Sequence, residues 1–266
     1  EEKKQSRVLK PFTSMPSAYV IYNDKKFLQM SSNNYLGLAG DSRLQNAVIE
    51  AITKYGVGST GSRLISGTHK LHFELENRIA ELKRTEKALV FSTGYATNVG
   101  VISSLLNEND AVYSDELNHA SIIDGIRLAK CKKFIYKHCD ISDLDRLLNE
   151  NHNKFRLNVI ITDTIFSMDG DSAPLEEIVR LKEKYRAVLY IDEAHAFGIY
   201  GDNGQGLAHK LNLDKKIDIQ MGTLSKAAGS EGGYVAGKAI LIDYLINKSR
   251  SFIFSTAPSI PLLKET

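Results

Sequence analysis

The sequence predicts an α/β fold with a mostly parallel central sheet and helices on both faces. Short β-rich runs recur along the chain with amphipathic helical patterns between them, which is typical of βαβ units. Several of the runs are continuously apolar, as expected for strands that are buried on both sides. The 266 residues are 42% hydrophobic and 25% charged, a composition that excludes disordered and collagen-like chains.

Seven strands and seven helices are expected in the main part of the chain. The short apolar runs predict strands at residues 88–91, 111–114, 133–136, 158–162, 187–192, 217–221 and 233–236. Apolar residues at helical spacing predict helices at residues 44–55, 71–82, 96–106, 120–129, 144–149, 175–185 and 240–247.

The first 40 residues differ from the rest. Polar turns surround Pro11 and Pro16, and a hairpin is expected over residues 18–30, turning at Asn23-Asp24. No repeat or low-complexity linker divides the remaining chain. We therefore expect an N-terminal arm, residues 1–40, laid against one domain over residues 41–266.

Charge and cysteine content restrict the function classes. The 34 Lys and Arg against 32 Asp and Glu give a formal charge of +2, which indicates neither a nucleic-acid nor a membrane partner. No apolar run approaches the roughly 20 residues that span a bilayer, and the first residues do not resemble a signal peptide. Cys131 and Cys139 have no second pair to complete a zinc site. We expect a cytoplasmic protein with reduced thiols and no metal.

Three motif-like strings fail the test of context. Residues 56–61 spell G-x-G-x-x-G but follow a helical pattern, whereas the dinucleotide fingerprint follows a strand. Residues 232–239 read G-x-x-x-x-G-K-A, and Ala239 lacks the hydroxyl that binds magnesium in a P-loop. Residues 192–195 spell D-E-A-H, the box found in a class of helicases. They precede the near P-loop in this chain, whereas in helicases the phosphate-binding loop comes first. These contexts argue against an NTPase.

Lys226 is a candidate for covalent chemistry. It comes just after a predicted buried strand, among small and hydroxylated neighbours. Burial disfavours the charged ammonium, and the neutral amine can form a Schiff base with a carbonyl or abstract a proton. This suits an aldehyde cofactor. A lysine that merely closes a turn is the alternative.

Asp192 ends a strongly apolar predicted strand, where ligands of open α/β sheets bind. A carboxylate there can pair with a protonated pyridine nitrogen, the electron sink of pyridoxal phosphate. His195, three residues on, can reach the phenolic oxygen of the cofactor. A carboxylate that caps a turn beside a solvated histidine is the alternative.

Residues 91–98 predict a site for phosphate. They run from a strand through a small-residue turn into a helix start, where backbone N–H groups bind anions, and Gly94 allows close approach. Thr223 can add a hydroxyl. His119, after another strand, has a flat ring that can stack on a pyridine face, although a lone histidine can also simply begin a helix.

Together these residues identify a family. Segments 31–38, 61–68, 114–125, 166–171, 192–195 and 222–229 occur in the order found in the α-oxoamine synthases, pyridoxal-phosphate enzymes of fold type I. The sequence resembles this family from residue 31 to about residue 257.

The resemblance implies a role for each matching residue. Lys226 would hold the cofactor and later act as the base, while Asp192 pairs with the pyridine nitrogen. The remaining cofactor and substrate contacts that it implies are His119 stacked on the ring, His195 at the phenolic oxygen, Gly94, Tyr95 and Thr223 at the phosphate, and Asn33 and Ser167 near the amino-acid carboxylate. It further implies a homodimer with shared sites, in which Ser255 and Thr256 reach the phosphate in the partner subunit. Arg7 matches, over a short stretch, an arginine near the acyl-CoA.

The implied reaction is a decarboxylating condensation of an amino acid with an acyl-CoA. Residues 61–64 and 167–175 most resemble members that join L-alanine to pimeloyl-CoA, or to pimeloyl-carrier protein, in biotin biosynthesis. Members that acetylate glycine are the close alternative. Family members continue into a C-terminal domain that supplies an arginine for the substrate carboxylate, so we expect this chain to be truncated or part of a longer protein. A catalytically silent subunit is the remaining alternative.

Overall fold

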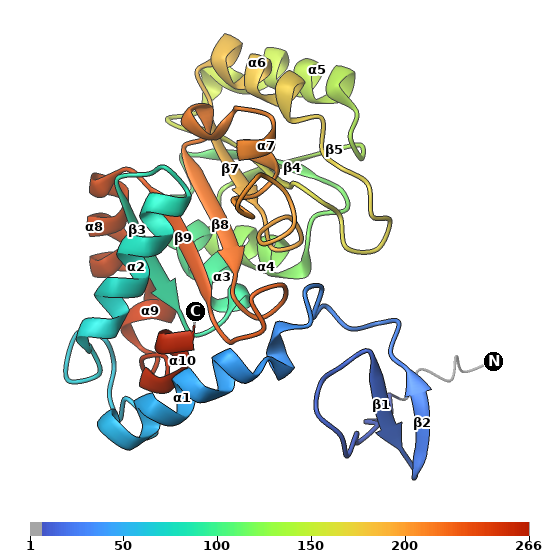
Figure 1. Cartoon of the computed structure of the whole chain (residues 1–266). Coiled ribbons are helices and arrows are strands. Elements are labelled where there is room, and N and C mark those ends of the chain that lie inside the picture. Colours follow the sequence, from blue (N-terminus) through green and yellow to red (C-terminus); the bar gives the residue numbers. More distant parts are fainter. Residues whose placement is uncertain (1–6, 266) are drawn as a thin grey trace.

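The computed structural model describes residues 7–265. Within them, a seven-stranded sheet has the order β3-β9-β8-β7-β6-β4-β5, and a separate two-stranded sheet pairs β1 with β2 (Figure 1). The strands are β1 (Tyr19–Tyr22), β2 (Lys25–Leu28), β3 (Lys87–Phe91), β4 (Ala111–Asp115), β5 (Lys132–Tyr136), β6 (Asn158–Asp163), β7 (Val188–Asp192), β8 (Ile219–Thr223) and β9 (Gly233–Gly237). In the large sheet β9 pairs antiparallel with β3 and β8, and the other pairs are parallel. The predicted fold class is confirmed.

Helices connect these strands. The α-helices are α1 (Ser42–Tyr55), α2 (Lys70–Leu82), α3 (Gly94–Leu105), α4 (Ala120–Ala129), α5 (Ile141–Asn151), α6 (Leu175–Tyr185), α7 (Leu207–Lys210), α8 (Ala239–Lys248), α9 (Arg250–Ile253) and α10 (Ile260–Glu265). Short 3-10 helices in the described part of the chain are η1 (Leu38–Gly40), η2 (His152–Lys154) and η3 (Asp214–Lys216). None of these helices is long and apolar enough to cross a membrane.

The large sheet separates two large apolar cores, and a smaller apolar cluster packs helix α2 against β3 and β9. Helices α5, α6 and α7 cover one face, and α3, α4, α8 and α9 cover the other (Figure 1). Side chains alternate along each strand, so Leu189 and Ile191 of β7 enter the first core while Tyr190 enters the second. Strands that are buried on both faces explain the continuous apolar runs in the sequence.

Capping residues set the helix ends more sharply than apolar spacing does. Helix α1 begins at Ser42 because the Asp41 side chain accepts from the Arg43 amide. Helix α5 runs from Ile141 instead of the predicted residue 144 because Asp140 caps it in the same way, by accepting from the Asp143 amide. These caps extend both helices beyond the residues that face the core.

The prediction of a strand at 217–221 is wrong by two residues. Strand β8 begins at Ile219, because Ile217 follows the 3-10 helix η3 and packs into the other core. It continues through Gly222 and Thr223, which pair with Tyr234 and Gly233 of β9 although they are not apolar. Backbone pairing, not side-chain character, sets this end of the strand.

The predicted hairpin is confirmed. Strands β1 and β2 pair antiparallel, and both turn residues, Asn23 and Asp24, have positive φ values of 48° and 57°. This is the pattern of a two-residue turn that matches the twist of a hairpin. The hairpin lies apart from the large sheet, near the N-terminal end of α1 (Figure 1). Its Phe27 and Leu28 side chains are exposed.

Candidate functional site

Polar side chains meet at one edge of the large sheet. Asp163, Asp192 and Thr223 end the neighbouring strands β6, β7 and β8, and β3 leads into the turn before α3 at the same edge. A pocket of about 220 Å³ lies there. It is lined by Thr93, Gly94, Tyr95, Asn98, His119, Ser121, Asp163, Ser167, Asp192, Ala194, His195, Met221, Thr223, Ser225 and Lys226. Eight residues predicted as site residues therefore share one pocket.

Lys226 lies in the turn after β8. Its carbonyl accepts from the Gly229 amide at 3.0 Å, and Gly229 has a φ of 71°. A Cβ at Gly229 would lie 2.5 Å from the backbone nitrogen of Ala39, so the turn requires glycine there. Burial lowers the pKa of the Lys226 amine, and the charges of Asp192 and Asp163 oppose this shift only in part. The site thus favours the neutral, nucleophilic amine.

A hydrogen-bonded chain leads from Lys226 out of the pocket. The Nζ atom of Lys226 lies 2.6 Å from His195 Nε2, and His195 Nδ1 lies 2.7 Å from the Tyr35 hydroxyl. That hydroxyl donates to Asn33 Oδ1 at 3.1 Å. Because the Tyr35 proton is used on Asn33, we infer that His195 carries its proton on Nδ1 and accepts from Lys226 at Nε2. Burial is the main cause that lowers the pKa of His195 to about 4, so the imidazole is neutral.

Asp192 is held by two donors. Its Oδ1 accepts from the Ala194 amide at 2.8 Å, and its Oδ2 accepts from Asn98 Nδ2 at 2.7 Å. The Tyr190 hydroxyl in turn donates to Asn98 Oδ1 at 2.6 Å. All three polar side chains are buried, and these bonds orient the Asp192 carboxylate at the pocket wall.

His119 and Asp163 form the adjoining wall. His119 caps helix α4, and its Nδ1 lies 2.7 Å from Ser121 Oγ. Its backbone amide donates to Asp163 Oδ2 at 2.8 Å. Burial and the nearby Asp192 charge raise the pKa of Asp163 well above its usual value. Two carboxylates at adjacent strand ends cannot both ionise easily, which is typical of functional sites.

The start of helix α3 forms the third wall. Thr93 caps the helix by accepting from the Ala96 amide at 3.0 Å. Among residues 7–265, no acceptor is found for the amides of Gly94 and Tyr95. A Cβ at Gly94 would lie 3.3 Å from Thr223 Oγ1, so glycine keeps this corner open. Free amides at a helix N-terminus suit an anion such as phosphate.

The structure places the other predicted site residues outside the pocket lining. Asn33 is linked to it through Tyr35 and His195, as described above. Thr256 forms an antiparallel bridge with Ser62, and Ser255 precedes it on the same segment. Arg7 is exposed. The expected roles of these residues remain predictions.

Sequence reasoning missed Asp163, Asn98 and Tyr35. Asp163 could have been found, because it ends a buried strand beside Asp192. Asn98 lies in helix α3, one turn after Gly94, and only its tertiary contact with Asp192 distinguishes it. Tyr35 lies in the segment 31–38 that identified the family, but its partner His195 is 160 residues away.

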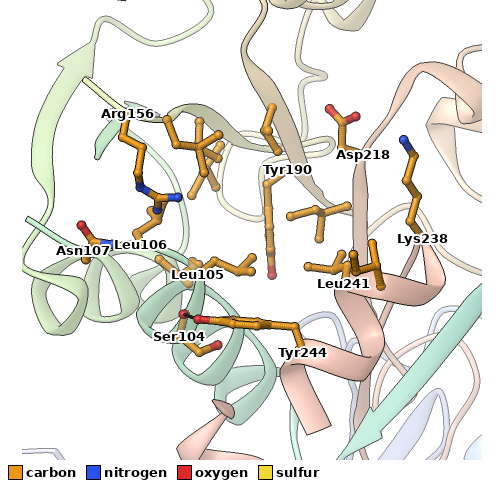
Figure 2. Close-up of a pocket in the computed structure, with 17 residues that line it drawn as sticks. Ser104, Leu105, Leu106, Asn107, Arg156, Tyr190, Asp218, Lys238, Leu241 and Tyr244 are labelled. Carbon is orange, nitrogen blue, oxygen red and sulfur yellow. Dashed lines mark hydrogen bonds between the residues drawn. The ribbon is translucent and has the colours of Figure 1, made fainter. Parts of the chain in front are cut away.

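A larger cavity of about 720 Å³ lies at the opposite edge of the sheet (Figure 2). Side chains of α3 and α8, such as Leu105 and Leu241, line it together with Tyr190, and it is mainly apolar. Two of its charged groups, Arg156 and Asp218, are paired with Asp110 and Lys182 respectively. The mainly apolar lining distinguishes this cavity from the smaller pocket, in which polar side chains converge.

Known proteins of one family are similar to this chain. A sequence model described as aminotransferase class I and II matches residues 25–264. The chain is 51% identical over 259 residues to an 8-amino-7-oxononanoate synthase of Lysinibacillus sphaericus, covering 97% of this chain and 66% of that protein. It is 52% identical over 249 residues to 8-amino-7-oxononanoate synthase 1 of Bacillus subtilis (strain 168), covering 94% of this chain and 63% of that protein. The chain thus spans slightly less than two thirds of these relatives.

Solved structures show the same architecture. Serine palmitoyltransferase from S. paucimobilis, determined with a bound PLP–myriocin aldimine, has a TM-score of 0.92 and 30% identity, covering 97% of this chain and 65% of that chain. An 8-amino-7-oxononanoate synthase from Francisella tularensis has a TM-score of 0.76 and 29% identity, covering 88% of this chain and 65% of that chain. These matches confirm the resemblance to the α-oxoamine synthases, and the chain belongs to the aminotransferase class I and II family.

Proposed function

We propose that this protein is a pyridoxal-phosphate enzyme that condenses L-alanine with pimeloyl-CoA, or with pimeloyl-carrier protein, to form 8-amino-7-oxononanoate for biotin biosynthesis. The names of relatives that are 51% and 52% identical support this substrate pair. The observation that carries the proposal is the shared pocket of Lys226 and Asp192, in which burial lowers the pKa of the lysine.

The residues of the pocket fit pyridoxal phosphate. The lowered pKa of the Lys226 amine suits an aldehyde, and the Asp192 carboxylate suits a protonated pyridine nitrogen. The free amides of Gly94 and Tyr95, with the hydroxyl groups of Thr223 and Ser225, suit the phosphate. The ring of His119 would stack on the cofactor, and His195 would contact its phenolic oxygen.

When bound, the cofactor supplies a pyridinium ring that delocalises the carbanion left after the amino acid loses its α-proton. Lys226 has a lone pair at Nζ that can accept this proton, because burial disfavours its ammonium form. His195 accepts from Lys226 at Nε2, and Tyr35 fixes the orientation of the imidazole. Asn98 holds the Asp192 carboxylate toward the pocket, so the negative charge stays in place during the reaction.

The remaining predicted site residues are proposed to contact the substrates and the partner subunit. Asn33 and Ser167 would contact the carboxylate of the amino acid, and Arg7 would lie near the acyl-CoA. Ser255 and Thr256 would serve the phosphate site of a partner subunit in a cytoplasmic homodimer. Sedimentation of the purified protein at several concentrations tests the dimer.

A crossed product assay tests the reaction. Alanine and glycine are each combined with pimeloyl-CoA and with acetyl-CoA, and free CoA and the condensed product are measured, for this chain and for any longer form of the protein. We expect CoA release with alanine and pimeloyl-CoA. Turnover of glycine with acetyl-CoA alone would instead identify a glycine C-acetyltransferase. No turnover of any pair by either form would indicate a silent subunit.

A further inference from the structure

A histidine outside the pocket lies between two carboxylates. His138 follows strand β5, and its Nδ1 lies 2.9 Å from Oδ1 of Asp115, the last residue of β4. Its Nε2 lies 2.8 Å from Oδ2 of Asp171, in the loop between β6 and α6. The ring also packs edge-on against Phe166 of that loop, with ring centroids 4.4 Å apart. Three segments therefore meet at this one imidazole.

The two contacts define the protonation state. An ionised carboxylate only accepts hydrogen bonds, so each ring nitrogen of His138 must carry a proton to donate to its partner. Burial lowers the pKa of His138, but the hydrogen bonds to Asp115 and Asp171 outweigh it, and the net shift is upward. The other ionisable groups that face it are Glu116, which accepts from its backbone amide at 2.8 Å, and the thiol of Cys139. The surroundings thus favour an imidazolium ion.

A metal ion is the alternative occupant of this cluster, since Asp115, His138 and Cys139 lie close together. The contacts disfavour it. Besides His138, the carboxylate of Asp115 accepts from the amides of Leu117 and Cys139, both at 2.9 Å. Burial and the charges of Asp115 and Asp171 raise the pKa of the Cys139 thiol to about 11, so the thiol is protonated at neutral pH.

The two carboxylates that bind His138, Asp115 and Asp171, each lie on a segment that leads to the walls of the pocket. Asp171 closes the loop that carries Ser167, in which the Phe166 amide donates to the Asp171 carbonyl at 3.0 Å. Asp115 begins the connection that leads to His119. Ser167 and His119 both line the pocket. An imidazolium at His138, between Asp115 and Asp171, would hold the Ser167 loop and the β4–α4 connection at a fixed separation.

We propose that His138 is a positioning residue whose imidazolium form ties the Ser167 loop to the β4–α4 connection and so shapes the amino-acid side of the pocket. This proposal rests on the proposed function only for its effect on substrate. The tie itself is a property of the free protein. It should hold at pH values below the raised pKa of His138 and weaken as the pH rises through it, because only the doubly protonated ring can donate to both carboxylates.

Titration by NMR of the protein without cofactor, in EDTA, tests the tie directly. The His138 ring signal is assigned as the one lost in His138→Gln. We expect its pKa to lie above the ordinary value of about 6.5 and to fall in Asp171→Asn, which removes one negative charge. A pKa at or below the ordinary value, or one that Asp171→Asn does not change, would overturn the proposal.

Hydrogen exchange tests the loop. Amides of residues 166–172 should exchange faster in both His138→Gln and Asp171→Asn than in the wild type, and the difference should shrink above the His138 pKa. Asp169→Asn is the matched control, because within residues 7–265 no hydrogen bond or ion pair of the Asp169 side chain is found. Equal exchange in all four proteins would contradict the proposal, whether or not the enzyme turns over.

Kinetics then separate positioning from a general loss of structure. We expect His138→Gln to raise KM for the amino acid about tenfold at a pH below the His138 pKa, the scale of a lost charged hydrogen bond, with a smaller change in kcat. At a pH above the His138 pKa, the two proteins should have similar KM values. A loss of kcat that is the same at every pH would indicate a merely structural residue. Failure of the crossed product assay with a normal NMR titration would reject the proposed function alone.

Discussion

At Lys226, burial determines the chemistry of a single side chain. The amine is partly buried beside His195, and the surrounding charges of Asp192 and Asp163 do not restore its usual pKa. A lysine with a lowered pKa gains its neutral form as the pH rises through that lower value, so it becomes nucleophilic at a pH where exposed lysines are still charged.

This leads to a prediction for covalent capture of pyridoxal phosphate. The extent of attachment, fixed with borohydride and read from the visible absorbance and by peptide mass, should reach half its maximum at a pH below 10.5, the usual lysine value. Lys226→Ala should abolish the label, and Lys248→Ala should leave it unchanged. A label that survives Lys226→Ala would contradict the assignment.

A second prediction about a single residue concerns Asn98. Asn98→Ala removes the donor to Asp192 Oδ2. A hydrogen bond to a charged group contributes about 1.5–3 kcal/mol, so kcat/KM should fall roughly 10- to 100-fold. Ser121→Ala, which removes the other acceptor of Asn98 Nδ2, is the control and should cost less. Unchanged kinetics in a folded Asn98→Ala variant would show that Asp192 needs no such support.

At the scale of elements, helix α3 combines a structural and a binding role at its first residue. Gly94→Ala should not lower the thermal midpoint of the cofactor-free protein, because alanine favours helices by about 0.5–1 kcal/mol over glycine. Its Cβ would nevertheless lie 3.3 Å from both Met221 and Thr223 and narrow the pocket. We expect the Kd for pyridoxal phosphate to rise about tenfold or more, a cost of roughly 1.4 kcal/mol. Ser103→Ala, farther along α3, should change neither value.

Whether a segment is a helix or a strand was predictable from the sequence, because apolar residues recur with a different spacing in the two kinds of element. Strands β6 and β7 each contain a continuous apolar run, and α4 and α6 match the predicted residues 120–129 and 175–185 in full. Ends were less predictable, since they depend on single hydrogen bonds such as the cap at Asp140 or on the pairing of Thr223 with Gly233. Apolar periodicity reports which residues face the core, and it carries no information about where the backbone stops pairing.

At the scale of the whole molecule, a buried ion pair joins the helix α2 side of the fold to the edge of the sheet that bears the pocket. Lys83 follows α2 and pairs with Glu193, which comes directly after Asp192, and both side chains are at most 1% exposed. Lys83 also donates to the carbonyl of Gln205 at 2.5 Å, and Glu193 Oε1 accepts from the Ala208 amide at 3.0 Å. The pair therefore connects three segments: the end of α2, the residue after β7, and the stretch that leads into α7.

Removing one partner of the Lys83–Glu193 pair should lower the stability of the fold strongly. Lys83→Met leaves Glu193 as an unpaired buried charge, and we expect a loss of about 3–5 kcal/mol in the free energy of unfolding, measured by urea titration. The matched control is Lys87→Met, whose partner Asp243 is exposed, and it should cost less than about 1 kcal/mol. Equal losses for the two variants would mean that burial does not govern the strength of the Lys83–Glu193 pair.

The sequence by itself determined the fold class and most of the residues that share the pocket. Lys226, Asp192 and Thr223 were recognisable because each lies at or just after the carboxyl end of a buried strand, and parallel strands bring those ends to one edge of the sheet. Only the tertiary structure decided what surrounds them. Asn98 meets Asp192 across 94 residues of chain and Tyr35 meets His195 across 160, and such contacts exist only once packing has brought distant segments together.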